Sequence, residues 1–253
     1  MTYAINMVPV SPVRSAPSHK AEMVSQLLFG EAMQVIAEEK EWLHISCIHD
    51  GYEGWCHRSH IQFADELSSV SPLLAGDWDN KVMFRDAVMH IPMGSQLQYM
   101  GLIDGTHDSA GITGLDIVKP VPFNGDALIA RAKMFLNTAY LWGGRSVYGV
   151  DCSGFCQVVY SFFQKYLPRD AWQQALEGEA IGFLQEARAG DLAFFDNEEG
   201  RITHVGILID ASTIIHASGK VRIDKIDPAG ILNMDTNTRT HRLRVVKRVV
   251  TSD

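Results

Sequence analysis

The chain has few cysteines, no excess of positive charge and no long apolar segment. Only four of its 253 residues are cysteines, too few for a disulfide scaffold. Acidic residues outnumber Lys and Arg by 30 to 22, whereas nucleic-acid binding depends on dense basic surfaces. No window approaches the roughly 18 apolar residues that a membrane-spanning helix requires. These absences argue against a small disulfide-stabilised protein, a nucleic-acid partner and a membrane span.

The chain as given also begins without a recognisable secretory signal. Its first residues, "MTYAINMVPVSPVRSAP", have neither the basic start nor the uninterrupted apolar stretch of such a signal. We therefore expect a cytoplasmic protein with reduced thiols, and a signal removed from the natural chain is the alternative. Cys47 and Cys56 are expected to be free buried thiols, although a disulfide between adjacent strands stays open.

The segment 1–65 has the pattern of a small barrel. Apolar residues alternate at Met33 and Val35 and again at Leu43, Ile45 and Cys47, and "HDGYEG" is typical of a turn between strands. Strand-like pieces continue over 66–119, which predicts a second, divergent barrel. The run "KPVPF" then indicates a boundary, because its two prolines oppose both helix and central strand.

The hydrophobic period changes after this boundary, so residues 120–253 are predicted to form a third domain. Leu128, Ala132, Phe135 and Leu136 follow helical spacing. A second helical pattern runs from Phe155 through Phe162 and Phe163 to Tyr166 and is expected to end before Pro168. Short β-rich runs with tight turns follow. Helices first and an antiparallel sheet after them predict an α+β fold.

Cys152 stands at the junction between a Gly-rich loop and the second predicted helix. A thiol at a helix N-terminus near an imidazolium has a lowered pKa, which makes it a nucleophile. The backbone N–H of Cys152, in the first turn of the helix, is a candidate donor to an oxyanion. Taken alone, a cysteine before a helix is more often a packed small residue.

Two histidines on predicted strands supply the base that such a nucleophile needs. His204 in "THVGILID" and His216 in "IIHASG" are twelve residues apart, which suits neighbouring antiparallel strands joined by a turn at Asp210 to Ser212. Both imidazoles are then expected on one face of the sheet. We predict His204 as the base and His216 as the group that orients it.

Three other interpretations of these residues stay open. Cys152, His204 and His216 are all residue types that bind zinc, but they lack the usual close pair of ligands. Cys152 and Cys156 are four residues apart rather than in the Cys-x-x-Cys arrangement of redox pairs. A binding protein without catalysis is the non-enzyme alternative.

Five motifs in a fixed order tie the C-terminal segment to a known family. From about Asn124 to Val246 the chain resembles the NlpC-type cell-wall cysteine peptidases, through "YLWGG", "DCSGF", "AGDLAFF", "THVGILI" and "IIHASG". The resemblance implies a papain-like domain with Cys152 as nucleophile, His204 as base, His216 as the orienting residue and Tyr140 as a group that stabilises the oxyanion. It implies no cofactor and no metal.

The first predicted barrel resembles the bacterial SH3-like domains. The resemblance is carried by seven positions: Gly30, Val35, Trp42, Ile45, Gly51, Gly54 and Trp55. Barrels ahead of a peptidase domain, together with "LPRDAWQQALEGEAI", narrow the resemblance to the dipeptidyl-peptidase VI type. Such enzymes hydrolyse the γ-D-glutamyl-L-diamino acid bond of free muropeptides with an unblocked N-terminal L-Ala, in murein peptide recycling.

This narrower resemblance implies substrate-binding residues. Asp151 is expected to hold the substrate ammonium, together with Glu53, and the Tyr52 to Trp55 turn to form a wall of the pocket. On the carboxylate side the expected residues are Ser153, Arg169 and Asp170. The partner is then a short peptide such as L-Ala-γ-D-Glu-diamino acid, with diaminopimelate and lysine both open at the third position. The alternatives are a secreted or wall-associated peptidoglycan hydrolase and a non-catalytic protein that binds cell wall through SH3-like modules.

Overall fold

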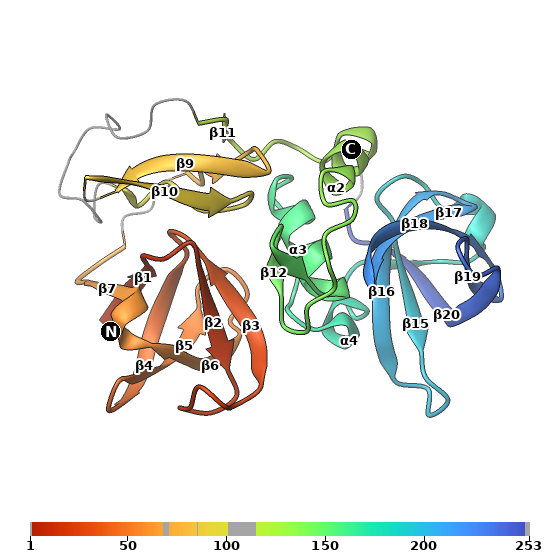
Figure 1. Cartoon of the computed structure of the whole chain (residues 1–253). Coiled ribbons are helices and arrows are strands. Elements are labelled where there is room, and N and C mark those ends of the chain that lie inside the picture. Colours follow the sequence, from red (N-terminus) through yellow and green to blue (C-terminus); the bar gives the residue numbers. More distant parts are fainter. Residues whose placement is uncertain (1, 68–70, 85, 101–114, 251–253) are drawn as a thin grey trace. The chain divides into compact units, whose positions relative to one another are not determined.

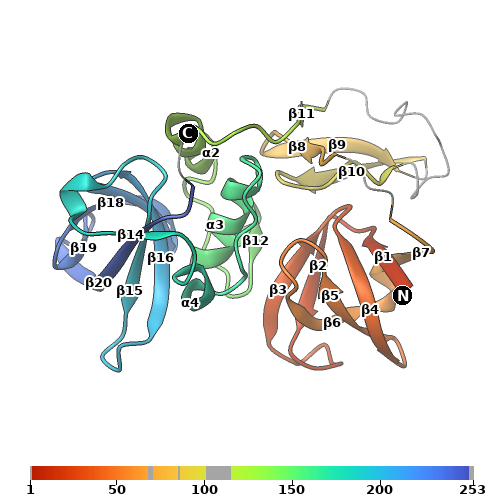
Figure 2. The ribbon, with the colours of Figure 1, turned by 180° about the vertical axis from the view of Figure 1, so that it is seen from behind.

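The structure, a computed structural model, describes residues 2–67, 71–84, 86–100 and 115–250. Figures 1 and 2 show the chain from opposite sides. It divides into two compact units. The N-terminal unit runs to Pro120 and also contains Trp142–Tyr148, and the C-terminal unit consists of Val121–Leu141 and the residues from Gly149 onward. The chain thus leaves the N-terminal unit within the "KPVPF" segment and enters it once more just before Cys152.

Seven short antiparallel strands form the first part of the N-terminal unit, in the order β3-β2-β6-β5-β4-β1-β7 (Figure 1). Their bounds are β1 Thr2–Asn6, β2 Val10–Arg14, β3 Met23–Leu28, β4 Ala32–Glu39, β5 Trp42–Cys47, β6 Glu53–His57 and β7 Ile61–Ala64, with the 3-10 turn η1 Arg58–His60. The sheet curls into the small barrel that the turn and strand pattern predicts (Figure 1).

The alternating residues of the barrel strands point into its core. Met33, Leu43, Ile45 and Cys47 are at most 2% exposed, because side chains at every second position of a strand share one face. The turn between β5 and β6 follows "HDGYEG", where Gly51 has the positive φ of +70° that glycine adopts without strain. Cys47 and Cys56 are both buried free thiols, as the sequence predicts.

The described part of 66–119 contains two small two-stranded sheets. They are β9 (Asp79–Phe84) with β10 (Ala87–Pro92), and β8 (Leu74–Ala75) with β11 (Ile117–Val118). The prediction of a second barrel also rests on residues 68–70, 85 and 101–114, which lie outside the described residues, so it stays a prediction.

This segment shares a hydrophobic core with the first barrel. Ile5 and Phe29 of the barrel belong to the same buried cluster as Val82 and Ile91. At the turn before β4 the backbones approach closely, since a Cβ on Gly30 would lie 1.8 Å from the carbonyl oxygen of Gln96. Phe29 therefore packs between the two parts, and the described residues of 66–119 are built onto the barrel.

The C-terminal unit combines short helices with a second seven-stranded sheet. The helical elements are α2 Gly125–Lys133, α3 Cys152–Ser161, α4 Ala171–Gln174 and the 3-10 turn η3 Leu184–Glu186. The strands are β13 Gly149–Val150, β14 Glu179–Ile181, β15 Leu192–Asp196, β16 Ile202–Asp210, β17 Thr213–Ser218, β18 Lys220–Asp227, β19 Gly230–Asn233 and β20 Thr238–Arg248. This arrangement is the predicted α+β fold.

Six of these strands close into a barrel. The sheet runs β14-β20-β15-β16-β17-β18-β19, and β20 also pairs with β19, so the ring from β15 to β20 has no open edge. A cluster that includes Phe195, Leu208, Ile214 and Ile231 fills its interior. Helix α3 packs against β16 and β17 (Figure 1). The first turn of α3 therefore lies against the strands that carry the two predicted histidines.

Both predicted helices form, and both end earlier than their apolar spacing indicates. Helix α3 ends at Ser161, although the pattern continues to Tyr166. Gln164 adopts a left-handed φ of 58°, and the Lys165 N–H donates to the Tyr160 carbonyl at 3.4 Å, which closes the helix in a C-terminal turn. Phe162 and Phe163 are still buried, so their spacing reflects tertiary packing rather than helix. Helix α2 likewise ends at Lys133.

A buried ion pair holds Trp142–Tyr148 within the N-terminal unit. β12 (Arg145–Ser146) places the Arg145 guanidinium against Glu31, with Nη1 to Oε2 at 2.8 Å and Nη2 to Oε1 at 3.0 Å. Both side chains are only 4% exposed. Arg145 Nη1 also donates to the Gln26 carbonyl at 2.7 Å, and Trp142 Nε1 donates to Glu22 at 2.7 Å. The loop that leads to Cys152 is therefore anchored by residues of the barrel.

Removing one partner of this pair is expected to destabilise the protein strongly. Glu31→Gln leaves the Arg145 charge buried without its counterion, and such losses cost about 3–5 kcal/mol. Urea unfolding of the full chain measures the change. Glu38→Gln is the matched control, because its pair with Arg58 is about half exposed and such pairs contribute about 0–1 kcal/mol. Equal unfolding midpoints for the two variants would contradict the anchoring role of Arg145.

Candidate active site

Cys152 is the first residue of α3, and Asp151 caps the helix. The Asp151 backbone is extended, with φ −94° and ψ 177°, and its Oδ1 accepts a hydrogen bond from the Gly154 N–H at 2.7 Å. Cys152 is 7% exposed. The carboxylate cap thus places the thiol in the first turn of a helix whose first nine residues are all buried.

The pKa of the Cys152 thiol is raised rather than lowered. Burial raises it to about 12, and the Asp151 charge acts in the same direction. The Val205 N–H and the Arg169 guanidinium favour the thiolate but do not offset burial. The expectation of a pKa lowered by a neighbouring imidazolium is therefore wrong for this resting state. The thiol is protonated at neutral pH and needs a base to become a nucleophile.

A chain of hydrogen bonds joins three neighbouring strands of the barrel. His204 on β16 and His216 on β17 are joined by a 2.9 Å hydrogen bond between Nε2 and Nδ1. His216 Nε2 in turn lies 3.0 Å from Oδ2 of Asp224 on β18. The two rings meet edge to face, with an interplanar angle of 81°. The structure thus brings the two predicted histidines together and adds a buried carboxylate behind them.

The hairpin between β16 and β17 explains this geometry. Gly206 pairs with His216 across the hairpin, so His204 lies diagonal to His216 on the same face. A Cβ on Gly206 would lie 2.8 Å from the Cβ of His216, and glycine leaves room for the imidazole. The turn falls at residues 211–212, within the predicted segment.

His204 is a neutral imidazole in this environment. Burial lowers its pKa well below the ordinary value of 6.5, and His216 and His241 act in the same direction. His241 on β20 stacks on the His204 ring, with centroids 4.2 Å apart and an interplanar angle of 26°. Burial lowers the pKa of His241 to about 4. A neutral His204 is able to accept a proton.

The Cys152 thiol lies near the strand that carries His204. The Val205 N–H, next in the chain to His204, hydrogen-bonds to the Cys152 thiol, and α3 packs against β16. His204 uses Nε2 toward His216, which leaves Nδ1 as the nitrogen available to the thiol. The arrangement is that of a nucleophile, a base and an orienting residue.

Tyr140 lies beside the same residues. Its N–H donates to the Gly219 carbonyl at 3.0 Å, and it forms a parallel bridge with Val150. Burial raises the pKa of the phenol to about 12, with smaller contributions from the charges of Cys152 and Asp151. The phenol therefore keeps its proton at neutral pH and is a hydrogen-bond donor.

Asp151 is paired with Arg169 in the structure. Arg169 Nη2 lies 2.5 Å from Asp151 Oδ2, and Nη1 lies 3.2 Å from Oδ1 and 2.9 Å from the Ser153 hydroxyl. All three side chains are buried. From the sequence, Asp151 is expected to bind a substrate ammonium and Arg169 a substrate carboxylate. In the structure these two charges neutralise each other.

The other predicted substrate residues have different surroundings. Asp170 caps α4 in a capping box with Gln173. In the N-terminal unit, Glu53 is 59% exposed on its side chain and lies 3.7 Å from His44, whose ring stacks on Trp55. Tyr52 is half-buried, and its N–H donates to Asp50 at 3.0 Å. A substrate role for Tyr52, Glu53 and Trp55 stays a prediction.

Asp224 and His241 belong to this cluster but are not among the site residues expected from the sequence. Asp224 stands among the apolar residues Val221, Ile223 and Ile226 in a β-rich run. An acid within such a run indicates a buried polar partner. His241 lies in a run of arginines and threonines, where nothing in the local pattern sets it apart. Its position against His204 arises only because β20 closes the barrel.

The geometry does not favour zinc. His204 Nε2 and His216 Nδ1 bond to each other at 2.9 Å instead of converging on an ion. In the described part of the chain no group of three or more His, Cys, Asp or Glu side chains is arranged to hold a metal. Over the same residues, no helix is long and apolar enough to cross a membrane.

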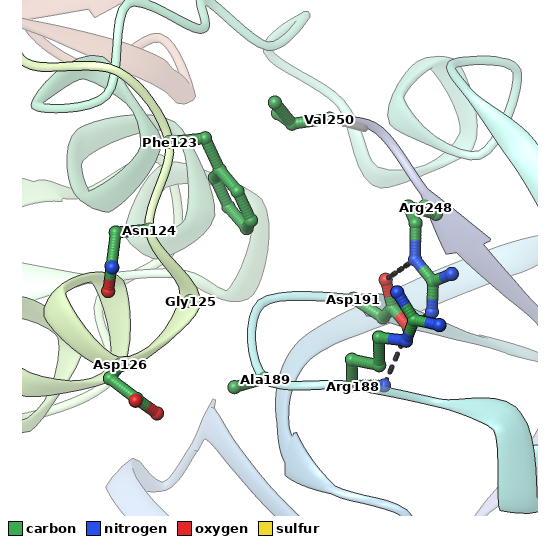
Figure 3. A pocket seen from close by; sticks show the side chains of 9 residues that line it. All are labelled: Phe123, Asn124, Gly125, Asp126, Arg188, Ala189, Asp191, Arg248 and Val250. Atoms are coloured by element: carbon green, nitrogen blue, oxygen red, sulfur yellow. Dashed lines mark hydrogen bonds and ion pairs between the residues drawn. The ribbon is translucent and has the colours of Figure 1, made fainter. Parts of the chain in front are cut away.

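Figure 3 shows a pocket of about 230 Å³ elsewhere on the C-terminal unit. It lies between the start of α2 and the end of β20. Arg248 in its wall is already paired with Asp191, with Nη2 to Oδ2 at 2.7 Å. None of the candidate catalytic residues lines this pocket, so we do not assign it to the reaction.

The comparisons with known proteins agree with this geometry. Residues 137–240 match the NlpC/P60 family, and residues 13–61 match the bacterial dipeptidyl-peptidase SH3 domain. A γ-D-glutamyl-L-lysine dipeptidyl-peptidase of Bacillus subtilis is 29% identical over 212 residues, which cover 76% of this chain and 71% of that protein. A dipeptidyl-peptidase 6 of Lysinibacillus sphaericus is 25% identical over 265 residues, which cover 88% and 92%.

A solved structure supports the fold over nearly the whole chain. The crystal structure of an NlpC/P60 family protein from Bacillus cereus has a TM-score of 0.80 at 19% identity, covering 98% of this chain and 100% of that one. The matches confirm the resemblance drawn from the five sequence motifs and from the barrel pattern. The chain therefore contains an NlpC/P60 domain, preceded by a bacterial dipeptidyl-peptidase SH3 domain.

Proposed function

We propose that the protein is a cysteine peptidase that hydrolyses the γ-D-glutamyl-L-diamino acid bond of free cell-wall peptides with an unblocked N-terminal L-Ala. The names of the B. subtilis and L. sphaericus relatives support this substrate class. The observation that carries the chemistry is the buried His204, bonded to His216 at 2.9 Å, whose neighbour Val205 hydrogen-bonds through its N–H to the Cys152 thiol at the start of α3.

Acylation begins with a proton transfer. His204 Nδ1 takes the proton of the Cys152 thiol as the sulfur attacks the carbonyl carbon of the scissile bond. The tetrahedral oxyanion accepts hydrogen bonds from the Cys152 backbone N–H and the Tyr140 hydroxyl. The imidazolium of His204 then gives its proton to the leaving amine. The C–N bond breaks, and the acyl group stays on sulfur as a thioester.

Deacylation runs through the same groups. His204, neutral again, takes a proton from water, and the resulting hydroxide attacks the thioester carbonyl. The thiolate leaves and recovers its proton from His204. Acylation and deacylation each begin with a neutral His204, which is protonated during the attack and gives the proton up as the leaving group departs. The buried hydrogen bond to His216 supports this cycle because it holds the ring in place during both transfers.

The binding of the peptide amine involves more than Asp151. Since Asp151 is paired with Arg169, we propose that the two act together, with Arg169 holding the carboxylate in position beside the thiol. Glu53 remains our candidate for a further acidic contact with the ammonium. As the setting we propose recycling of cell-wall peptides in the cytoplasm, where short peptides with free amines are the substrates.

Replacing the nucleophile is expected to abolish turnover. Cys152→Ala removes the sulfur that forms the thioester, and hydrolysis of L-Ala-γ-D-Glu-diaminopimelate should fall below detection by mass spectrometry. Cys156→Ala is the matched control, because this fully buried cysteine on the same helix takes no part in the reaction. The control should keep most of its activity. Turnover by Cys152→Ala, or inhibition of the wild type by chelators, would overturn the assignment.

The acid limb of the pH profile is expected below pH 6.5. His204 works as a neutral base, so kcat/KM falls as pH drops through its pKa, which burial, His216 and His241 hold below the ordinary 6.5. Initial rates from pH 4 to 8 measure the limb. Circular dichroism at each pH separates protonation from unfolding. An acid limb at pH 7 or above would contradict a neutral, buried His204.

The choice of substrate separates recycling from wall degradation. We expect a free amine to be required, because N-acetylation removes the proposed charge-assisted hydrogen bonds of the ammonium to Asp151 and Glu53. Such bonds contribute about 1.5–3 kcal/mol each, and each 1.4 kcal/mol is a factor of ten. N-acetylation should thus lower kcat/KM by about 10²-fold or more.

Three peptides test this prediction: the free tripeptide, its N-acetylated form and the same peptide on muramic acid. Parallel series with diaminopimelate and lysine identify the third residue, and Glu53→Gln tests the predicted second acid. Comparable kcat/KM for all three forms would move the protein to the wall-degrading class.

A further inference from the structure

The carboxylate behind His216, Asp224, is buried and bonded at both oxygens. Asp224 is 1% exposed on β18 and accepts four hydrogen bonds. Oδ2 receives Nε of Arg222 at 2.7 Å and Nε2 of His216 at 3.0 Å. Oδ1 receives Nη2 of Arg222 at 3.0 Å and the Met234 N–H at 2.8 Å. Three of the four partners, the two guanidinium N–H groups of Arg222 and the Met234 N–H, can only donate.

A bidentate guanidinium and a backbone N–H on the two oxygens of Asp224 favour its ionised form. Burial alone would raise the pKa of Asp224, but the hydrogen bonds from His216, Arg222 and Met234 hold it well below its usual value. Arg222 is itself fixed by Asp235 at 3.1 Å and by Asn233 at 3.0 Å. Asp224 is therefore a carboxylate of fixed orientation that has only acceptor atoms to offer His216.

We propose that Asp224 is a positioning residue that sets the protonation pattern of His216 and, through it, of the base His204. The inference rests on the proposed function, because it concerns the same base. Asp224 does not touch the reacting atoms.

The pattern follows from one donor and one acceptor per neutral imidazole. An acceptor-only Asp224 requires the His216 proton on Nε2. His216 Nδ1 then carries a lone pair and accepts from His204, so the His204 proton lies on Nε2. His204 Nδ1 is left with its lone pair free for the thiol proton. A carboxylate two residues removed from sulfur thus decides which nitrogen of His204 is basic.

Replacing Asp224 by asparagine is expected to move the proton of each imidazole to its other nitrogen. With the side-chain oxygen of asparagine toward the Met234 N–H and Arg222 Nη2, its NH₂ group faces His216 Nε2. The same NH₂ group also faces the Arg222 Nε–H, which loses its acceptor. A donor at this point moves the His216 proton to Nδ1 and the His204 proton from Nε2 to Nδ1. The base then faces the thiol with a proton already in place. A comparable aspartate-to-asparagine exchange beside a catalytic histidine lowers kcat by about 10⁴-fold.

The experiment combines kinetics with imidazole ¹⁵N chemical shifts of the full-length protein, which report the protonated nitrogen of each ring. Wild type should show both His216 and His204 protonated on Nε2. Asp224→Asn should show both protonated on Nδ1, with kcat/KM for the free tripeptide lowered about 10³-fold or more. Asp227→Asn, on the same strand and in an exposed pair with Arg239, should leave shifts and kcat/KM within about twofold.

Arg222→Gln separates tautomer control from structural support. It loosens Asp224 but leaves the acceptor facing His216, so the wild-type tautomers and a loss of less than about tenfold are expected. Unchanged tautomers in Asp224→Asn, or equal losses in both variants, would overturn the proposal. If Asp224→Asn does not fold, the wild-type spectrum still decides, because a His216 proton on Nδ1 contradicts it. The shifts need no substrate, so failure of the proposed function would appear separately, as absence of peptide hydrolysis.

Discussion

The active-site geometry depends on one buried hydrogen bond, the 2.9 Å contact between the imidazoles of His204 and His216. Two neutral rings form such a bond only if one donates and the other accepts, so each ring limits the state of the other. The bond needs the β16 to β17 hairpin, the space that Gly206 leaves opposite His216, and a barrel closed by β20. The barrel therefore holds the imidazoles of His204 and His216 in place.

Burial sets the chemistry of this site. It keeps the Cys152 thiol protonated and His204 neutral, so the resting enzyme has no separated charge pair at the sulfur. In the proposed reaction the thiolate forms as the carbonyl is attacked. Such a site relies on positioning and on the acceptor capacity of His204 rather than on a preformed thiolate. The pairing of Asp151 with Arg169 fits this scheme, because an unpaired carboxylate would disfavour negative charge on sulfur still further.

Three buried acidic side chains are each paired with an arginine. Glu31 is bound by Arg145, Asp151 by Arg169 and Asp224 by Arg222. The planar guanidinium bonds a carboxylate through two nitrogens and fixes its orientation. The pair of Glu31 with Arg145 holds the segment Trp142–Tyr148. The pair of Asp151 with Arg169 fixes the cap of α3. The pair of Asp224 with Arg222 fixes the hydrogen-bond acceptor behind His216. Arginine is therefore as important to the arrangement of this site as histidine.

The sequence by itself determined the local elements and the identity of the main groups. Period-two spacing marks the barrel strands around Leu43 and Ile45, helical spacing marks the start of α3, and the twelve-residue interval places His204 and His216 on one face. These features are local, since each depends on residues within one element or one hairpin.

Only the tertiary structure decided the rest. It ended α3 at Ser161, paired Asp151 with Arg169, raised the pKa of Cys152 and brought Asp224 and His241 to the histidine pair. Each of these depends on burial or on a contact between strands that are distant in the chain. Desolvation and long-range charge pairing act through space, and the order of residues along the chain does not encode them directly.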